Sequence, residues 1–413
     1  MEKVLYLIDG SGYIFRAYYA ISPLSTKDGF PTNALYGFTR MLLKTLREKG
    51  AQYLAVAFDS GRETFRREIF TEYKANRAEC PDDLNAQIPY FRQIVEALGI
   101  TTFEAPGYEA DDVIGSIIAV HKECVDKIVI VSGDKDLMQL VSDKIIVWDS
   151  MKDRVYDREK VKEKFGVYPE QLRDYLALVG DSSDNIPGLK GVGAKTAAQL
   201  LNKWKDINTL VNSLTEIEND KSIRGRAKIV EQLRTNLKAL NLSKKLVTIR
   251  DDISDYITVD GELKEKISSW SCEKFLKSVE LKDKDREKLK ELFEQFEFSS
   301  LLKEFNLNAP SVIKSSSSFT VKIAHKKNFK DFLQEILKQK EFAFDLETTS
   351  LNVFQAKVCG ISFCWSKNNG WYLPIYHKNY QDGLSFQELK PYLEKIFSLS
   401  SLKIGHNLKY DIN

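Results

Sequence analysis

Three short apolar runs, each followed within a few residues by aspartate, constrain the fold of the first half of the chain. The runs cover residues 4–8, 53–58 and 127–131, and they are rich in β-branched and aromatic residues. Short runs of this kind predict strands that are buried on both faces. Amphipathic helical patterns over 36–47 and 88–98 lie between them. This alternation predicts an α/β fold built on a parallel sheet.

The chain of 413 residues is long enough for two or three domains, at about 150 residues per domain. After the α/β part, helical patterns dominate. A polar stretch with four consecutive serines then interrupts all periodicity, as is typical of an interdomain linker, and further strand patterns follow it. We expect a catalytic domain over 1–168, a helical subdomain over 169–298, a linker over 299–318 and a further domain over 319–413.

The composition is that of an ordinary globular protein. Lys and Arg number 61 against 59 Asp and Glu, so the net charge of +2 neither indicates nor excludes a nucleic-acid partner. No segment resembles a signal peptide or is apolar and long enough to span a bilayer. The five cysteines are scattered without zinc-ligand spacing. We expect reduced, buried thiols in a soluble protein of the cytoplasm that has no membrane partner.

Acidic residues gather where the predicted strands end. Asp9 and Asp59 end the first two strands, and Asp134 and Asp136 follow the third. The carboxyl ends of parallel strands meet at one edge of a sheet, where ligands bind. A predicted helix start and a loop supply further acids, namely Glu109, Asp111, Asp112, Asp181 and Asp184.

Carboxylates gathered in one cleft repel one another unless divalent cations neutralise them. Oxygen ligands favour Mg²⁺ or Mn²⁺ over zinc. A pair of such ions can activate water and stabilise the attacking and leaving oxygens of a phosphodiester. Each acid alone also has a structural interpretation, because Asp111 and Asp112 suit a helix N-terminus and Asp181 and Asp184 suit a turn.

A basic segment directly follows Asp59. It contains Arg66, Tyr73, Lys74 and Arg77, and such cations can hold phosphates while aromatic rings stack on bases. The alternative is an amphipathic helix with a charged outer face.

A glycine-rich turn lies further along the chain. Gly188, Gly191 and Gly193 precede a predicted helix that opens with Lys195 and Thr196. Backbone N–H groups at such a helix N-terminus suit a phosphate, although the spacing is not that of a P-loop. A plain connection between two helices is the alternative.

Five motifs together resemble the 5′ nuclease domain of the bacterial DNA polymerase I family, which belongs to the flap endonucleases and has a PIN-like fold. They cover roughly the first 290 residues in family order: LIDGSGYIFRAYYA, FDSGRETFRREIFTEYKANR, GYEADDVIG, SGDKDLMQLV and GDSSDNIPGLKGVGAKTAAQLL. The resemblance implies a first metal held by Asp9, Asp59, Glu109 and Asp111, with Asp112 adjoining. It implies that a second metal site is held or shaped by Asp134, Asp136, Asp181 and Asp184.

The same resemblance assigns roles to the basic residues. It implies that Tyr73 and Lys74 lie at the base of a helical arch that admits the 5′ end, and that Arg66 and Arg77 contact the scissile region. It also implies that the glycine-rich turn is part of a helix-three-turn-helix motif. Through its glycines, Lys195 and Thr196, this motif would bind duplex phosphates and, in many members, a K⁺ ion.

Two later motifs, FAFDLETTSLN and GHNLKYDIN, resemble the first two motifs of a 3′–5′ proofreading exonuclease domain with an RNase H-like fold. This implies metal ligands at Asp345, Glu347 and Asp411. An acidic pair after a strand can also be a simple turn. The family's third motif and its polymerase domain would lie beyond Asn413, so we expect a truncated domain without 3′–5′ exonuclease activity.

We therefore expect a monomeric, metal-dependent 5′–3′ exonuclease and flap endonuclease of the bacterial cytoplasm. Its partners would be DNA with 5′ flaps, nicks or RNA primers, in replication and repair. Two alternatives stay open, namely a ribonuclease of the PIN type and a non-catalytic, structure-specific DNA-binding protein.

Overall fold

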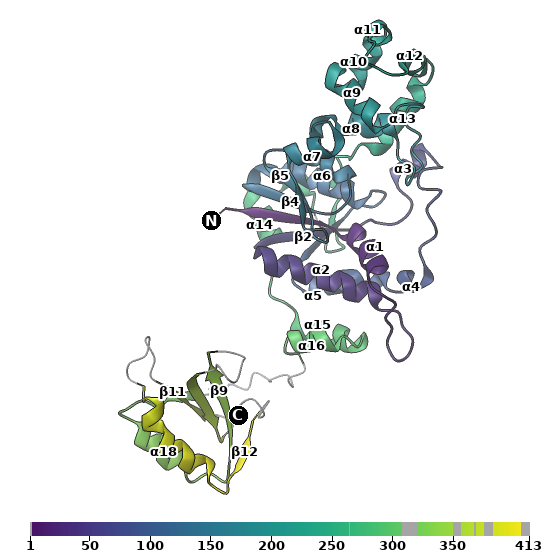
Figure 1. Cartoon of the computed structure of the whole chain (residues 1–413). Coiled ribbons are helices and arrows are strands. Elements are labelled where there is room, and N and C mark those ends of the chain that lie inside the picture. Colours follow the sequence, from purple (N-terminus) through teal and green to yellow (C-terminus); the bar gives the residue numbers. More distant parts are fainter. Residues whose placement is uncertain are drawn as a thin grey trace. The chain divides into compact units, whose positions relative to one another are not determined.

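The computed structural model of the chain describes residues 2–263, 265–307, 320–349, 357–366, 369–375 and 383–405. The chain divides into two compact units, Met1–Asn308 and Ala309–Asn413 (Figure 1). The division falls inside the expected linker. However, that segment begins with helix α16 (Ser299–Glu304), whose Leu301 and Leu302 are buried in the first unit, so the folded part extends further than its polar sequence indicated.

A seven-stranded sheet forms the centre of the first unit, in the order β6-β5-β4-β1-β2-β3-β7. Five strands are parallel, and the two edge strands β6 and β7 are antiparallel to their neighbours. The bounds are β1 (Val4–Asp9), β2 (Tyr53–Ala57), β3 (Thr101–Glu104), β4 (Lys127–Val131), β5 (Ile145–Asp149), β6 (Arg154–Tyr156) and β7 (Thr258–Val259). The predicted parallel α/β fold and its three strands are confirmed.

Helices cover both faces of this sheet. Leu5 and Leu7 of β1 belong to one buried cluster, whereas Tyr6 and Ile8 belong to a second cluster on the opposite face. The first face packs against α6 (Ala110–His121) and α14 (Cys272–Val279). The second packs against α1 (Gly10–Ala20), α2 (Asn33–Lys49), α5 (Ile88–Ala97) and α15 (Arg286–Gln295) (Figure 1). Burial on both faces explains why the strands are continuous apolar runs.

A group of helices follows β6, as the sequence predicted. The bounds are α7 (Arg158–Phe165), α8 (Pro169–Val179), α9 (Ala194–Trp204), α10 (Ile207–Asn212), α11 (Leu214–Asn219), α12 (Arg226–Thr235) and α13 (Leu237–Val247). The chain then returns to the sheet through β7, α14 and α15. The last part of the predicted helical subdomain therefore belongs to the α/β core, because periodicity shows that a helix has an apolar face but not which surface that face covers.

The segment between β2 and α5 contains little regular structure. Only α3 (Phe65–Ile69) and α4 (Asp82–Asn85) form there, and Tyr73 and Lys74 lie in the turns between them. The backbone of Lys74 is left-handed, with φ of 55°.

The second unit contains a five-stranded sheet in the order β12-β9-β10-β11-β8. The bounds are β8 (Thr320–Ile323), α17 (Phe329–Ile336), β9 (Glu341–Thr348), β10 (Val358–Cys364), β11 (Asn369–Pro374), α18 (Phe386–Phe397) and β12 (Leu402–Ile404). Asp345 and Glu347 are exposed on β9, and Asp411 lies outside the described residues.

The cysteines differ from the prediction. Cys124 and Cys272 form a disulfide although 148 positions separate them, and the free thiols of Cys80, Cys359 and Cys364 are half-buried. The expectation of five reduced, buried thiols is therefore wrong, since scattered spacing does not reveal which cysteines the fold brings together. Among the described residues, no helix combines the length and apolarity that a membrane crossing needs.

Candidate metal centre

The central strand β1 delivers the first acid. Strand order runs outward from β1 in both directions, so a crevice opens beside its carboxyl end. Asp9 is its last residue and only 5% exposed. Its carboxylate accepts hydrogen bonds from the backbone N of Gly12 at 2.7 Å and from Oγ of Ser132 at 2.8 Å. A Cβ at Gly12 would collide with this carboxylate, so only glycine fits there.

The start of helix α6 carries the next acids. Glu109 is the N-cap residue, and Asp111 lies in the first turn. Asp59, two residues after β2, accepts a hydrogen bond from the backbone N of Ala110 at 2.7 Å. The end of β2 is therefore fixed to the beginning of α6.

The loop after β4 carries a further pair. The backbone N of Asp134 donates to Oγ of Ser132 at 3.0 Å, and the backbone N of Asp136 donates to Oδ1 of Asp134 at 2.8 Å. Oδ1 of Asp136 is buried and has no hydrogen-bond partner. Ser132, which connects Asp9 with this loop, was not among the predicted residues, and only its position directly after a buried strand could have indicated it.

Asp181 and Asp184 lie in the loop after α8, and both contact cations. Nζ of Lys135 is 2.6 Å from Oδ2 of Asp181. The guanidinium of Arg77 forms an ion pair with Asp184. The loop is closed by paired backbone hydrogen bonds between Asp181 and Ile186, which hold its acids toward the crevice.

The end of β1, the start of α1 and the loops after β4 and α8 line a polar cavity of about 340 Å³, whereas Asp59, Glu109 and Asp111 are not among its lining residues. Its lining residues are Asp9, Gly12, Arg16, Arg77, Gly133, Asp134, Lys135, Asp136, Asp181, Ser183 and Asp184. Burial is the main reason that the pKa of Asp9 rises to about 6 and that of Asp136 to about 8. Burial, followed by repulsion from Asp134 and Asp9, raises the pKa of Asp111 well above its ordinary value.

Lys74 and Tyr73 contact Glu109 beside this cavity. Nζ of Lys74 donates to Oε1 of Glu109 at 2.7 Å, and the Tyr73 hydroxyl donates to Oε2 at 3.2 Å. The backbone N of Lys74 donates to the carbonyl of Asp184 at 2.9 Å. Although burial acts in the opposite direction, Lys74 and Arg66 hold the pKa of Glu109 below its ordinary value.

The donor chemistry of this site fits a hard divalent cation. In the described part of the chain, no three acidic, His or Cys side chains are already set around one point as ligands, and lysine and arginine groups contact several of the acids instead. Yet the acids offer oxygen donors only, one oxygen of Asp136 is buried without a partner, and burial penalises the charges of Asp9, Asp111 and Asp136.

Asp112 and Arg66 lie beside Glu109 and are paired with each other. Asp112 is fully buried and accepts two hydrogen bonds from Arg66, at 2.6 and 2.8 Å, and one each from the backbone N of Glu109 and Arg250. Arg66 is 3% exposed and also donates to two backbone carbonyls at the C-terminal end of α13, those of Leu246 at 2.8 Å and of the C-cap residue Thr248 at 2.9 Å. Arg66 also lies 3.5 Å from Oε2 of Glu109, so this buried pair adjoins the acids and connects them to α13 through structural contacts.

The glycine-rich turn connects α8 with α9. Gly188 has φ of 62°, and a Cβ there would lie 2.6 Å from the backbone of Val179, so close packing requires glycine. Gly191 and Gly193 are exposed and have open space where a Cβ would be. Gly193 is the N-cap residue of α9, and Lys195 and Thr196 lie in the first turn of that helix, with Lys195 exposed.

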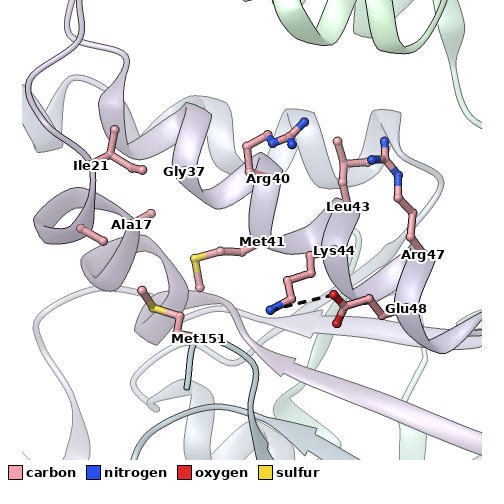
Figure 2. Close-up of a pocket in the computed structure, with 11 residues that line it drawn as sticks. Ala17, Ile21, Gly37, Arg40, Met41, Leu43, Lys44, Arg47, Glu48 and Met151 are labelled. Carbon is pink, nitrogen blue, oxygen red and sulfur yellow. Dashed lines mark ion pairs between the residues drawn. The ribbon is translucent and has the colours of Figure 1, made fainter. Parts of the chain in front are cut away.

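A second cavity, of about 410 Å³, lies between α1 and α2 (Figure 2). Ala17, Ile21 and Met41 contribute apolar lining, and Met151 faces them from the loop after β5. Lys44 at its rim contacts Glu48 at 4.0 Å. Because no group of acidic side chains lines this cavity, it does not offer the carboxylate oxygen ligands that line the first cavity.

Comparisons with known proteins assign the fold to a class of nuclease, the 5′–3′ exonucleases. Three family models match the chain: the N-terminal resolvase-like domain of 5′–3′ exonucleases over residues 4–166, their C-terminal SAM fold over 167–267, and a 3′–5′ exonuclease domain over 320–413. A zinc-bound structure of the T5 5′-exonuclease has the same fold, with a TM-score of 0.52 and 23% identity, covering 67% of this chain and 98% of that protein.

Similar proteins of known name show which family of nucleases the chain belongs to. A 5′–3′ exonuclease of Aquifex aeolicus is 40% identical over 302 residues, which cover 73% of this chain and 95% of that protein. The chain therefore belongs to the 5′–3′ exonuclease family, whose members cut phosphodiester bonds. The DNA polymerase I of Pseudomonas aeruginosa is 35% identical over the whole of this chain, which spans 44% of that polymerase.

Proposed function

We propose that the chain is a divalent-metal-dependent 5′–3′ exonuclease and 5′-flap endonuclease that acts on DNA. The main support is one polar cavity at the carboxyl ends of the sheet. One strand end and two loops bring five carboxylates together there, namely Asp9, Asp134, Asp136, Asp181 and Asp184. DNA polymerisation is proposed only for longer proteins of the kind found in Pseudomonas aeruginosa, of which this chain spans less than half.

In this proposal, the acids form two groups of metal ligands for Mg²⁺ or Mn²⁺. Asp9, Asp59, Glu109 and Asp111 would hold one ion, and Asp134, Asp136, Asp181 and Asp184 would hold or shape the site of the other. When bound, these ions would activate the attacking water and neutralise charge on the phosphodiester. Asp112 is left out of this set because its two carboxylate oxygens already accept four hydrogen bonds.

The chain's own cations orient the substrate phosphate. Lys74 and Arg77 lie beside Glu109 and Asp184, so their positive charges are available at the position where the scissile phosphate must approach the acids. Tyr73 is 3% exposed, which excludes a base-stacking role in this conformation. Its hydroxyl instead orients Glu109.

The helix start after the glycine-rich turn would bind the duplex. Backbone N–H groups at the N-terminus of α9, together with Lys195 and Thr196, can contact consecutive phosphates. Substrates with 5′ flaps, nicks or RNA primers would place the duplex on α9 and the 5′ strand at the acids. A K⁺ ion at this turn, a monomeric state and a place in the cytoplasm stay predictions.

A labelled 5′-flap duplex tests the proposal. The wild-type chain should cut it with Mg²⁺ and not with EDTA. Asp111→Asn should lower the cleavage rate by more than about 100-fold, because mutation of a residue that only hydrogen-bonds to a metal ligand already lowers activity by about 10–100-fold. Asp143→Asn, an exposed acid on another loop, is the matched control and should keep wild-type activity.

Two outcomes would favour the alternatives. Binding of the flap duplex in EDTA without any cut product in Mg²⁺ or Mn²⁺ would indicate a non-catalytic DNA-binding protein. Preferential cutting of single-stranded RNA over the flap would indicate a ribonuclease of the PIN type.

A further inference from the structure

The disulfide lies at the end of α6 opposite the acids. Cys124 ends a short 3₁₀ turn that continues α6, and Cys272 is the first residue of α14. Cys124 is half-buried and Cys272 is exposed. Small solutes can therefore reach the bond without any opening of the core. Because Glu109 and Asp111 lie at the other end of α6, this pair is separate from the proposed metal centre.

A buried histidine is oriented toward this sulfur pair. Nε2 of His121 lies 3.0 Å from the carbonyl oxygen of Ile267, which can only accept, so Nε2 carries the hydrogen. Nδ1 therefore keeps a free lone pair, and it lies 3.9 Å from Sγ of Cys124. The ring stacks on Phe275, with 4.0 Å between centroids and 9° between planes, and His121 is only 2% exposed.

These contacts fix both the tautomer and the orientation of the imidazole. Burial lowers the pKa of His121, which keeps the ring neutral near pH 7. A neutral imidazole whose unprotonated nitrogen faces a cysteine can accept the proton of that thiol. The thiolate that results is the reactive form of cysteine.

We propose that Cys124, Cys272 and His121 form a thiol–disulfide exchange site that reacts with a low-molecular-weight disulfide. His121 is the base for Cys124, and Cys272 is the second thiol. Disulfide bonds are rare inside cells, and most that do form belong to catalytic or redox-sensing cysteine pairs. An accessible cysteine pair with its own base is what such a redox site requires.

The exchange proceeds in two balanced steps. In the reduced chain, Nδ1 of His121 takes the proton of Cys124, and the thiolate attacks one sulfur of the small disulfide. That disulfide bond breaks, and the leaving thiolate takes up the proton. Cys272 then gives its proton to water and, as a thiolate, attacks Sγ of Cys124. The intramolecular bond forms, the mixed disulfide bond breaks, and the leaving thiolate takes up a proton from water to become the second small thiol. The two cysteines lose two electrons and two protons, and the small disulfide gains them.

Glutathione buffers test this site in the wild-type chain. The protein is equilibrated at increasing ratios of oxidised to reduced glutathione, quenched with acid, alkylated and analysed by peptide mass spectrometry. Cys124 and Cys272 should lose alkylation together at one ratio and regain it on reversal. Cys80, a half-buried thiol whose pKa is raised by burial, should stay alkylated and serves as the internal control.

A rate measurement tests the role of His121. In the reduced wild-type chain, iodoacetamide should modify Cys124 at least about tenfold faster than Cys80 at pH 7. His121→Gln, whose amide can still donate to the Ile267 carbonyl, should remove this difference and leave the Cys80 rate unchanged. The proposal is overturned if Cys124 and Cys272 stay alkylated at every glutathione ratio, or if Cys124 reacts no faster than Cys80 in the wild-type chain. An unchanged rate of Cys124 modification in His121→Gln would show that His121 is not the base of this site.

Discussion

Arg66 and Asp112 form an ion pair with two hydrogen bonds, at 2.6 and 2.8 Å, in which the side chains are 3% and 0% exposed. Arg66 follows the end of β2 in the chain, and Asp112 belongs to the helix that carries Glu109 and Asp111. Through the carbonyls of Leu246 and Thr248, the same guanidinium reaches the last residues of the helical subdomain. One side chain therefore connects the acidic helix to the end of α13.

Loss of Arg66 should be costly for stability. Arg66→Met leaves the Asp112 charge buried without its partner, and breaking a buried pair in this way costs about 3–5 kcal/mol. Urea denaturation should show this decrease in the free energy of unfolding. Arg158→Met is the matched control, since Arg158 also makes two hydrogen bonds to one carboxylate, that of Glu170, but on the surface. Its expected cost is at most about 1 kcal/mol, and equal costs for the two variants would contradict this account.

Stability of the metal-free protein should fall as pH rises. Asp136 keeps its proton up to about pH 8 in the folded protein but loses it near 3.8 in the unfolded chain. Between these values the folded form binds more protons, so the free energy of unfolding decreases with rising pH. Thermal unfolding in EDTA should therefore give a lower Tm at pH 8 than at pH 6. Asp136→Asn should flatten this dependence, whereas Asp143→Asn should keep it.

Divalent metal should reverse this effect. A cation that binds only the folded protein raises its stability, and it binds more strongly where the carboxylates are ionised. Saturating Mg²⁺ should raise Tm more at pH 8 than at pH 6. An identical increase at both values would show that Mg²⁺ binds away from the buried acids.

Lys74 should contribute to the chemical step. Lys74→Met removes the cation beside Glu109 and Asp184, and the loss of one group that stabilises developing charge lowers kcat by about 10²–10³-fold. Single-turnover cleavage of the flap duplex measures this step directly. Lys144→Met is the control, because Lys144 pairs with Glu123 just before β5 begins, at the opposite edge of the sheet. A wild-type rate for Lys74→Met would exclude this role.

Lys195 should act on binding instead of chemistry. A single phosphate contact contributes about one to the slope of log affinity against log salt. Lys195→Met should therefore weaken binding of the duplex in EDTA and reduce that slope by about one. Lys277→Met, which removes an exposed lysine of α14, should leave the slope unchanged.

The parallel sheet could be predicted because its strands are buried on both faces and are therefore apolar runs. The gathering of Asp9, Asp134 and Asp136 at one edge followed from the same pattern, since parallel strands share one carboxyl end. The positions of α14 and α15 could not be predicted, because their apolar faces do not specify the surface that they cover.

The roles of Asp111 and Asp112 show a second limit of prediction from the sequence. Asp111 and Asp112 are adjacent in sequence, yet successive helix positions point about 100° apart, so one is near the other acids and one faces Arg66. Sequence spacing alone did not separate these roles. The pairing of Cys124 with Cys272 was hidden in the same way, by a separation that only the folded chain removes.

The position of β1 between β2 and β4 also affects how the protein folds. Val4 pairs with Lys127, so the central hydrogen-bond ladder joins segments 123 residues apart and must close a long loop. Contacts of such high sequence separation form slowly. Because Asp9 meets Ser132 only after this ladder closes, Asp134 and Asp136 join Asp9 late in folding, and an ion held between these two segments would stabilise the chain only once the native topology is reached.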